Sequence, residues 1–322
     1  MLNYPIKFYP ILKEKIWGGT KLVTKLNKKS MLKNIGESWE LSDVEDNISI
    51  VSNGELAGKT LRELLESFKA ELIGEKNYAH FGNNFPLLIK FIDAKEDLSV
   101  QVHPNDELAK KLHNSFGKTE MWYIMQADTG SKLIVGFNKE ITPDQYLNYV
   151  AEKKIPSILN YERVKAGDAF FIEPGTVHTI GAGILLAEIQ QTSDITYRIY
   201  DWDRVDDQGN PRALHTDLAV EAINFNHKIE AKHNYSTFIN SLNTIVKCPY
   251  FITNFIHSVG EKELDYAETD TFVIFMCVQG KATILMGENS EIINYGETVL
   301  IPATAKKVVI ESKNCKLLEI TV

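Results

Sequence analysis

The chain has 322 residues, more than the roughly 100 to 200 that one ordinary core serves, so we expect two domains or one elaborated domain. Hydrophobic residues make up 44% and charged residues 24%, as in ordinary globular proteins. The net charge of −8 disfavours nucleic acid as a partner, but it leaves room for a small basic pocket for one phosphorylated metabolite. No apolar run approaches the roughly 20 residues that span a bilayer, and the first residues lack a leader pattern. We therefore expect a cytoplasmic protein with no membrane partner.

Helical periodicity is clear in three places along the chain. The first is 60–73, where Thr60 as N-cap and Glu63 three residues later form a capping box. A second short helix is expected over 107–113, after a Pro-Asn-Asp start signal, and a third over 216–225. The rest reads as short β-rich runs, punctuated by Gly, Pro, Asn and Asp at the spacing of an antiparallel sandwich or barrel, such as PLLIKFIDA, MWYIMQA, ILLAEIQQ and FVIFMCVQG.

Two segments far apart in the chain resemble each other. Residues 167–178 read GDAFFIEPGTVH and residues 296–306 read GETVLIPATAK, and both pass from glycine through an acidic residue and an apolar run to a proline turn. Four residues after the proline stands His178 in the first segment and Lys306 in the second. A true repeat would give two similar barrels, of which only the first keeps a ligand. Coincidence is the alternative, because this pattern describes many β-turns.

The boundary between the two units is expected in the polar, unpatterned segment between about 226 and 245. This gives a catalytic domain with short helical insertions over 1–235 and a metal-free domain over 236–322.

Residues 99–106 read SVQVHPND, in which an amide and an imidazole side chain stand near the end of a run of alternating polar and apolar residues. Successive side chains of a strand point to opposite faces, so we expect Ser99, Gln101 and His103 to share one face. The core face would carry Leu98, Val100 and Val102.

Gln101, His103, Glu120 and His178 are the candidate metal ligands. Two imidazoles with a carboxylate and an amide oxygen suit Zn, Fe, Mn or Ni, and three firm ligands leave room for water or substrate. Each residue also has a structural alternative, since Glu120 could begin a solvated strand and His178 could lie in an ordinary turn. The spacing alone is therefore a weak signal.

The order of these motifs resembles the metal motif of cupins: Q-x-H at a strand end, a glutamate that opens the next strand, then G-x6-P-G-x2-H. Longer segments between residues 16 and 215 are similar to type I mannose-6-phosphate isomerases in their short bacterial form; they are WGG, IGESWELS, PLLIKFIDAKEDLSVQVHP, GKTEMWYI, PGTVHTIGAGILLAEIQQTSDITYRIYDWDR and GNPRALH. From about residue 240 the chain resembles that family's second barrel only loosely. The resemblance implies a mainly β chain with two cupin-type jelly-roll barrels and short helical segments.

The same resemblance implies an aldose–ketose isomerase that interconverts mannose 6-phosphate and fructose 6-phosphate with one Zn²⁺ per chain. The metal ligands it implies are His103, Glu120 and His178, with Gln101 as the fourth.

Four further residues match catalytic or pocket positions of the family, namely Arg198, Lys118, Glu188 and Asp194. Isomerisation moves a proton between C1 and C2 through an enediolate, so a base must take a carbon-bound proton while positive charge stabilises the oxyanion. Arg198 and the metal would supply that charge, and Lys118 would shuttle a proton or polarise a bond. The base is left open between Glu188, Asp194 and a hydroxide on the metal.

Lys90 and Ser99 are the candidates for binding the phosphate, because phosphate recognition needs donors away from the metal. A lysine that points to solvent is the alternative for Lys90. Trp17 is a candidate for the wall of the substrate pocket, with a core position as its alternative.

Two other functions remain open. A cupin oxygenase would use the same ligands to hold Fe(II) with open faces for oxygen, and a sugar-binding cupin would carry no catalysis. The sequence leaves open a monomer or a homodimer.

Overall fold

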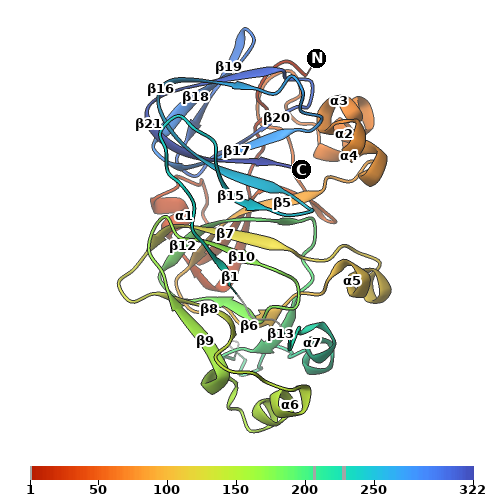
Figure 1. Cartoon of the computed structure of the whole chain (residues 1–322), viewed down its shortest axis with the longest axis vertical. Helices are drawn as coiled ribbons and strands as arrows, with labels where there is room; N and C mark the ends of the chain where they lie inside the picture. The colour runs from red at the N-terminus through yellow and green to blue at the C-terminus, as the bar shows by residue number, and fades with distance from the viewer. Residues whose placement is uncertain (1, 206–207, 227–229) are drawn as a thin grey trace.

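Strands are far more extensive than helices in this chain, and the expected mainly β class is confirmed (Figure 1). The computed structural model describes residues 2–205, 208–226 and 230–322. In these residues the strands form cupin-like sheets that do not close into continuous barrels. None of the helices described there is long and apolar enough to cross a membrane.

The first part of the chain contributes two of these sheets. The larger has seven strands in the order β1 (Ile11–Gly19), β2 (Ile35–Leu41), β5 (Leu87–Ala94), β12 (Ile184–Gln191), β7 (Glu120–Ala127), β10 (Ala169–Ile172) and β14 (Lys232–His233). The smaller has five in the order β13 (Tyr197–Tyr200), β6 (Val100–Val102), β11 (His178–Ile180), β8 (Lys132–Phe137) and β9 (Leu159–Arg163). All residues of β5 and β12 are buried, which explains why these strands read as nearly unbroken apolar runs.

Apolar side chains cover both faces of each sheet. One cluster contains side chains of both sheets, including Trp17, Trp122 and Leu133. Another joins the smaller sheet to α6 (Pro143–Ala151) and α7 (Thr216–Ala222). The polar residues of the site therefore lie in a frame packed from two directions.

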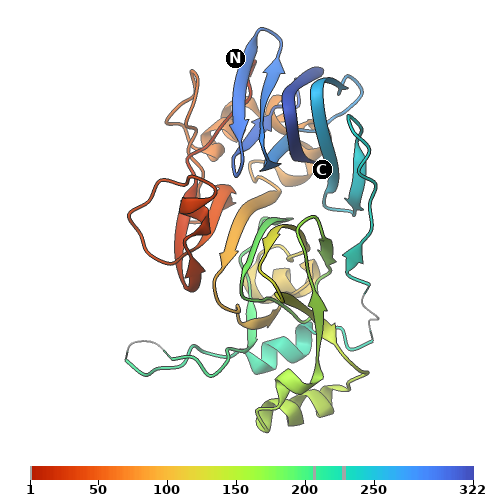
Figure 2. The same ribbon diagram turned by 90° about the vertical axis from the view of Figure 1, so that its left-hand side faces the viewer.

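The last part of the chain forms a further sheet, in the order β15 (Asn243–Lys247), β16 (Ile252–Asp265), β21 (Lys307–Thr321), β17 (Val273–Gln279) and β20 (Thr298–Ile301). The strand β18 (Lys281–Met286) pairs with β21 and with β19 (Asn289–Asn294). An apolar cluster joins this sheet to the larger one. Figures 1 and 2 show it at one end of the molecule, with α6 and α7 at the other.

The start of the chain also contacts this last sheet. The Ile6 N–H donates to the Leu300 carbonyl at 2.8 Å. The Asp270 carboxylate accepts the first N–H groups of α4 (Glu75–Phe81), at 2.7 Å from Glu75 N and 3.1 Å from Lys76 N. A division into folding domains at residue 235 stays a prediction, and residues 227–229 of the expected boundary segment lie outside the described residues.

The two similar segments of the sequence both fold as a strand, a proline turn and a second strand. The first runs from β10 to β11, and the second runs from β20 to β21. His178 is buried at the start of β11, whereas Lys306 is exposed just before β21. The last sheet therefore lacks, at this described position, an inward ligand like His178.

The helix expected over 60–73 is broken into two. α2 (Leu61–Phe68) has the capping box that the sequence predicted, but Lys69 adopts a φ of 48°, which a right-handed helix cannot continue. The chain resumes in α3 (Ala70–Ile73), which ends at Gly74 with a φ of 95°.

The other expected helices are present, but α1 (Lys21–Thr24), α4 and α6 were not predicted. α5 (Asp106–His113) and α7 match their predictions, although α7 ends at Ala222 rather than at residue 225. The longest of these, α6, has a capping box between Thr142 and Gln145. Its start signal, TPDQ, is present in the sequence.

Replacing Thr60 with alanine should lower the free energy of unfolding by about 1 kcal/mol, because an N-cap hydroxyl satisfies a helix N–H that is otherwise unpaired. The Thr60 hydroxyl accepts the Glu63 N–H at 3.2 Å, and the Glu63 carboxylate accepts the Thr60 N–H at 2.7 Å. Urea unfolding measures the loss. Ser67→Ala on the exposed face of the same helix is the control, and an equal effect of both substitutions would contradict the role of the cap.

Candidate active site

Strand β6 of the smaller sheet, which lies between β13 and β11, aligns three of the predicted side chains. Gln101 is paired with His178 of β11 on one side and with Arg198 of β13 on the other. Residues directly opposite each other in a sheet point to the same face, so these three side chains form a row.

The expected alternation holds where β6 is regular. Val100 and Val102 pack in the cluster with α6 and α7, and Gln101 and His103 both approach His178. Leu98 departs from the prediction and lies in the cluster of the two sheets, because the strand begins only at Val100.

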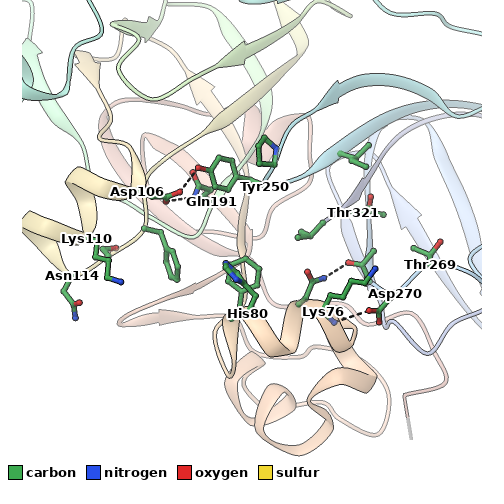
Figure 3. A pocket seen from close by; sticks show the side chains of 18 residues that line it. Lys76, His80, Asp106, Lys110, Asn114, Gln191, Tyr250, Thr269, Asp270 and Thr321 are labelled. Carbon is green, nitrogen blue, oxygen red and sulfur yellow. Dashed lines mark hydrogen bonds between the residues drawn. The ribbon is translucent and has the colours of Figure 1, made fainter.

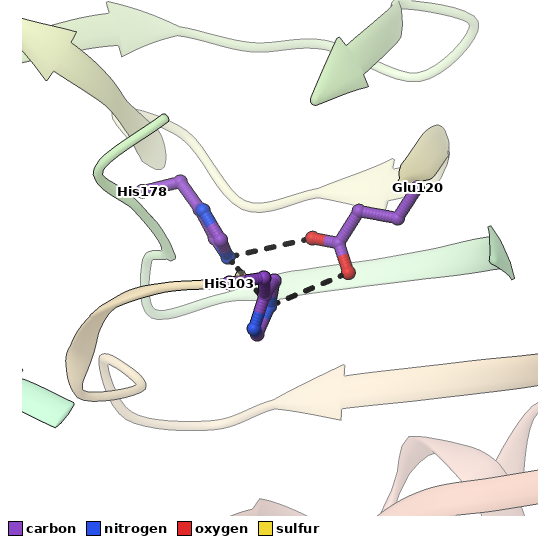
Figure 4. A group of neighbouring side chains, drawn as sticks. All are labelled: His103, Glu120 and His178. Atoms are coloured by element: carbon purple, nitrogen blue, oxygen red, sulfur yellow. Dashed lines mark hydrogen bonds and ion pairs between the residues drawn. The ribbon is translucent and has the colours of Figure 1, made fainter. Parts of the chain in front are cut away.

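Three buried side chains converge on one point, as Figure 4 shows. His103 follows β6, Glu120 opens β7 of the larger sheet, and His178 opens β11. The Nε2 atoms of the two histidines are 3.1 Å apart, and the Glu120 carboxylate lies 3.6 Å from His103 Nε2 and 3.4 Å from His178 Nε2. The two sheets therefore bring a His, Glu, His set together from segments that are distant in the sequence.

The two imidazoles are held with their Nε2 atoms turned toward each other. His103 Nδ1 is 2.9 Å from the Ile195 carbonyl, and His178 Nδ1 is 2.8 Å from the Thr176 carbonyl. A carbonyl only accepts, so each Nδ1 carries the hydrogen and each Nε2 offers a lone pair. Burial lowers the pKa of His103 well below its usual value and that of His178 to about 3, so both rings are neutral, as metal ligands must be.

The Glu120 carboxylate also suits a cation. Its Oε1 atom is buried and has no hydrogen-bond partner among the described residues. Burial raises the pKa of Glu120 to about 7, although the adjacent Lys118 ammonium lowers it. Two facing lone pairs and an unsatisfied carboxylate oxygen fit a divalent metal ion.

Two further residues touch this group. The Gln101 amide nitrogen lies 3.3 Å from His178 Nε2, and half a turn of the amide would present its oxygen instead. The Lys118 ammonium lies 3.0 Å from His103 Nε2 and forms an ion pair with Glu120. A positive charge thus already contacts two of the three ligands.

A second row of functional side chains crosses the larger sheet, where Glu188 of β12 is paired with Lys90 of β5 and Trp122 of β7. The Glu188 carboxylate lies 3.1 Å from the Lys90 ammonium and accepts the Trp122 indole N–H at 3.1 Å. Burial would raise the pKa of Glu188, but Lys90 and Lys118 outweigh it and hold that pKa well below its usual range. The Trp122 ring packs edge-on against the His178 ring, with 5.4 Å between the ring centroids, and so connects this row to the metal-binding group.

Arg198 lies half-buried at the end of the first row. One of its terminal nitrogens donates to the Ala213 carbonyl at 2.8 Å, while its buried Nε has no partner among the described residues. Burial and the neighbouring Arg212 lower its pKa. This guanidinium therefore has one buried N–H donor that is unsatisfied in the described residues.

The remaining predicted residues make no described contact with this group. Trp17 is buried in the cluster of the two sheets, which is a packing position. Ser99 is buried just before β6, and Asp194 is exposed between β12 and β13. Their proposed roles stay predictions.

Sequence reasoning missed several contacts that organise the site. Trp122 stands two residues after Glu120 on the same strand, so alternation could have placed it on the same face. Trp39, whose ring lies 5.1 Å from the Lys90 ammonium, had no such signal, and neither did the carbonyls of Thr176 and Ile195.

Facing β-sheets that bring two histidines and a glutamate to one buried point define a metal-binding protein of the cupin class. The model of the type I phosphomannose isomerase catalytic domain matches residues 6–136, and that of the mannose-6-phosphate isomerase cupin domain matches residues 241–322. Mannose-6-phosphate isomerase ManA of Bacillus subtilis is 36% identical over 305 residues, which cover 94% of either chain. The chain belongs to the type I mannose-6-phosphate isomerase family.

Solved structures agree with this assignment. The crystal structure of the mannose 6-phosphate isomerase from Bacillus subtilis matches with a TM-score of 0.90 and 31% identity, over 99% of this chain and 100% of that one. A zinc-bound holo mannose 6-phosphate isomerase shares the fold, with a TM-score of 0.79 at 16% identity over 98% of both chains.

Proposed function

We propose that this protein interconverts mannose 6-phosphate and fructose 6-phosphate. The observation that carries the proposal is the buried convergence of His103, Glu120 and His178 in a chain of this family. Family membership favours an isomerase over the cupin oxygenase and the non-catalytic sugar-binding protein.

We propose one Zn²⁺ per chain, held by His103, Glu120 and His178 with Gln101 as the fourth ligand. The donor set of two imidazoles and a carboxylate suits zinc, and zinc is the metal of the related holo structure. When bound, zinc supplies a Lewis acid that polarises the sugar carbonyl and anchors the adjacent hydroxyl.

Among the three candidate bases we favour Glu188. An isomerase base must be ionised to take the proton from C2 of the aldose and return it to C1. Glu188 is held ionised by Lys90 on a buried sheet face, whereas Asp194 is exposed in a connection. The charges of Arg198 and Lys118 would stabilise the oxyanion that develops as this proton leaves.

Lys90 and Ser99 remain the proposed phosphate-binding pair. The Lys90 ammonium already has Glu188 as a counter-ion, so a phosphate would share this lysine with the proposed base. A rise in KM for the sugar phosphate after substitution of either residue would support that contact.

Replacing Lys90 with methionine should move the acid limb of the pH–rate profile to higher pH. Without its cation, the buried Glu188 carboxylate gains a higher pKa, by at least about 1 unit, and is protonated over more of the acid range. The profile of kcat/KM against pH measures this. Lys132→Met, at an exposed lysine of β8, is the control, and an unmoved acid limb in Lys90→Met would reject Glu188 as the base.

The proposed activity is tested with purified protein and mannose 6-phosphate, by enzymes that detect fructose 6-phosphate. We expect conversion that needs no oxygen, stops after chelation and returns with zinc. Failure of the zinc-loaded protein to convert any aldose phosphate would reject the isomerase.

We also propose that the protein acts in the cytoplasm as a monomer or homodimer. Light scattering on the purified chain would distinguish these two forms, and a larger assembly would contradict both.

A further inference from the structure

Residues 114–119, between α5 and β7, form a loop that carries Lys118 into the active site. Neighbours outside the metal-binding group fix its backbone. The Gly117 N–H donates to the Asp106 carboxylate at 2.8 Å, and the Thr119 N–H donates to the Gln191 side-chain oxygen at 2.9 Å. The amides of the residues on either side of Lys118 are therefore held by side chains that touch no metal ligand in any described contact. The Lys118 N–H itself donates to the Pro104 carbonyl at 3.1 Å.

Asp106 is the centre of this arrangement, as Figure 3 shows. Its Oδ1 atom accepts both the Gly117 N–H and, at 3.0 Å, the Gln191 side-chain N–H. Its Oδ2 atom accepts the Tyr250 hydroxyl at 2.6 Å. One carboxylate thus joins the loop, the end of β12 and a tyrosine of the last sheet.

The loop lies so close to the start of α5 that only glycine fits at position 117. A Cβ atom there would lie 2.6 Å from the Asp106 nitrogen and 2.7 Å from the Asn105 carbonyl carbon. The backbone has little room to move toward the helix, so Asp106 and the Pro104 carbonyl together fix the backbone around Lys118.

Tyr250 comes from a distant part of the chain, the turn between β15 and β16. Burial and the Asp106 carboxylate raise its pKa to about 12, so the hydroxyl keeps its proton and donates it to Asp106 through the neutral pH range. This hydrogen bond therefore connects the turn between β15 and β16 to Asp106, which in turn holds the loop of residues 114–119.

We propose that Asp106 and Tyr250 are positioning residues for Lys118, and that this is one function of the C-terminal sheet. The inference rests on the proposed isomerase function, in which the Lys118 ammonium stabilises the developing oxyanion. A charge misplaced by a fraction of an ångström stabilises a transition state less well, while substrate bound mainly by other groups keeps its affinity.

Tyr250→Phe, which keeps the ring and removes the hydroxyl, should lower kcat about 10-fold, with KM within about 2-fold and zinc content unchanged. Tyr266→Phe is the matched control, because its hydroxyl also donates to a buried carboxylate, that of Glu319 at 3.0 Å, within the last sheet. We expect the control to lose stability without losing turnover.

A double-mutant cycle with Lys118→Met separates positioning from general destabilisation. If Tyr250 acts through Lys118, adding Tyr250→Phe to Lys118→Met should change the residual kcat by less than about 2-fold. An equal loss in both backgrounds, or wild-type kcat in Tyr250→Phe, would overturn the proposal.

Hydrogen exchange supplies a readout that does not depend on activity. In Tyr250→Phe the Gly117 and Thr119 amides should exchange faster than in the wild type and in Tyr266→Phe. An inactive wild type would reject the isomerase function. Unchanged exchange at these two amides in Tyr250→Phe would separately reject the proposal that Tyr250 positions the loop.

Discussion

Replacing His178 with asparagine should remove both the bound metal and the isomerase activity. The substitution removes one of the two facing Nε2 atoms that would bind the metal. His103 and Glu120 alone provide too few ligands to hold an ion firmly. A metal that stabilises transition-state charge is worth several kcal/mol, so kcat/KM should fall at least about 1000-fold. Elemental analysis and turnover are measured on the same sample.

His233→Asn is the control for this substitution. His233 also has its Nδ1 atom near a backbone carbonyl, that of Ile245 at 3.1 Å, but it lies on β14, away from the metal-binding group. It should keep its metal and its rate. Full metal content with wild-type turnover in His178→Asn would contradict the assignment of this ligand.

Replacing Arg198 with alanine should lower kcat about 100- to 1000-fold while the protein folds and keeps its metal, because a preorganised donor to a developing oxyanion contributes on this scale. The guanidinium has an unsatisfied Nε and stands beside Gln101 rather than among the three ligands. Turnover, metal content and thermal unfolding are measured together.

Arg163→Ala removes an exposed arginine from β9 of the same sheet and should have a near wild-type rate. A near wild-type kcat in Arg198→Ala would reject the catalytic role of this arginine.

Local features of the fold were predictable because their causes are local. The capping box of α2 depends on two residues three positions apart, and strand alternation placed Gln101 and His103 together. The break at Lys69 was not predictable, because lysine has no preference for a positive φ and its neighbours read as a continuous helix.

The convergence of the metal-binding group was predictable only through family resemblance. His103, Glu120 and His178 come from three strand ends in two sheets, and no periodicity in the sequence reports which strands face each other. Once the motif order suggested a cupin, the predicted set was the one that the structure brings together.

Contacts that depend on the order of strands in a sheet could not be predicted from the sequence. Lys90 and Glu188 pair because β12 inserts between β5 and β7, so a lysine expected to bind phosphate also neutralises a buried carboxylate. The hold of Tyr250 on Asp106 likewise depends on how the last sheet packs against the first part of the chain.

Anomalous diffraction at the zinc edge, from crystals of zinc-loaded protein, would locate the metal. We expect one peak per chain, at about 2.0 to 2.2 Å from the Nε2 atoms of His103 and His178 and from a Glu120 oxygen. A well-ordered chain with no peak between these three side chains, or with zinc only elsewhere, would contradict it.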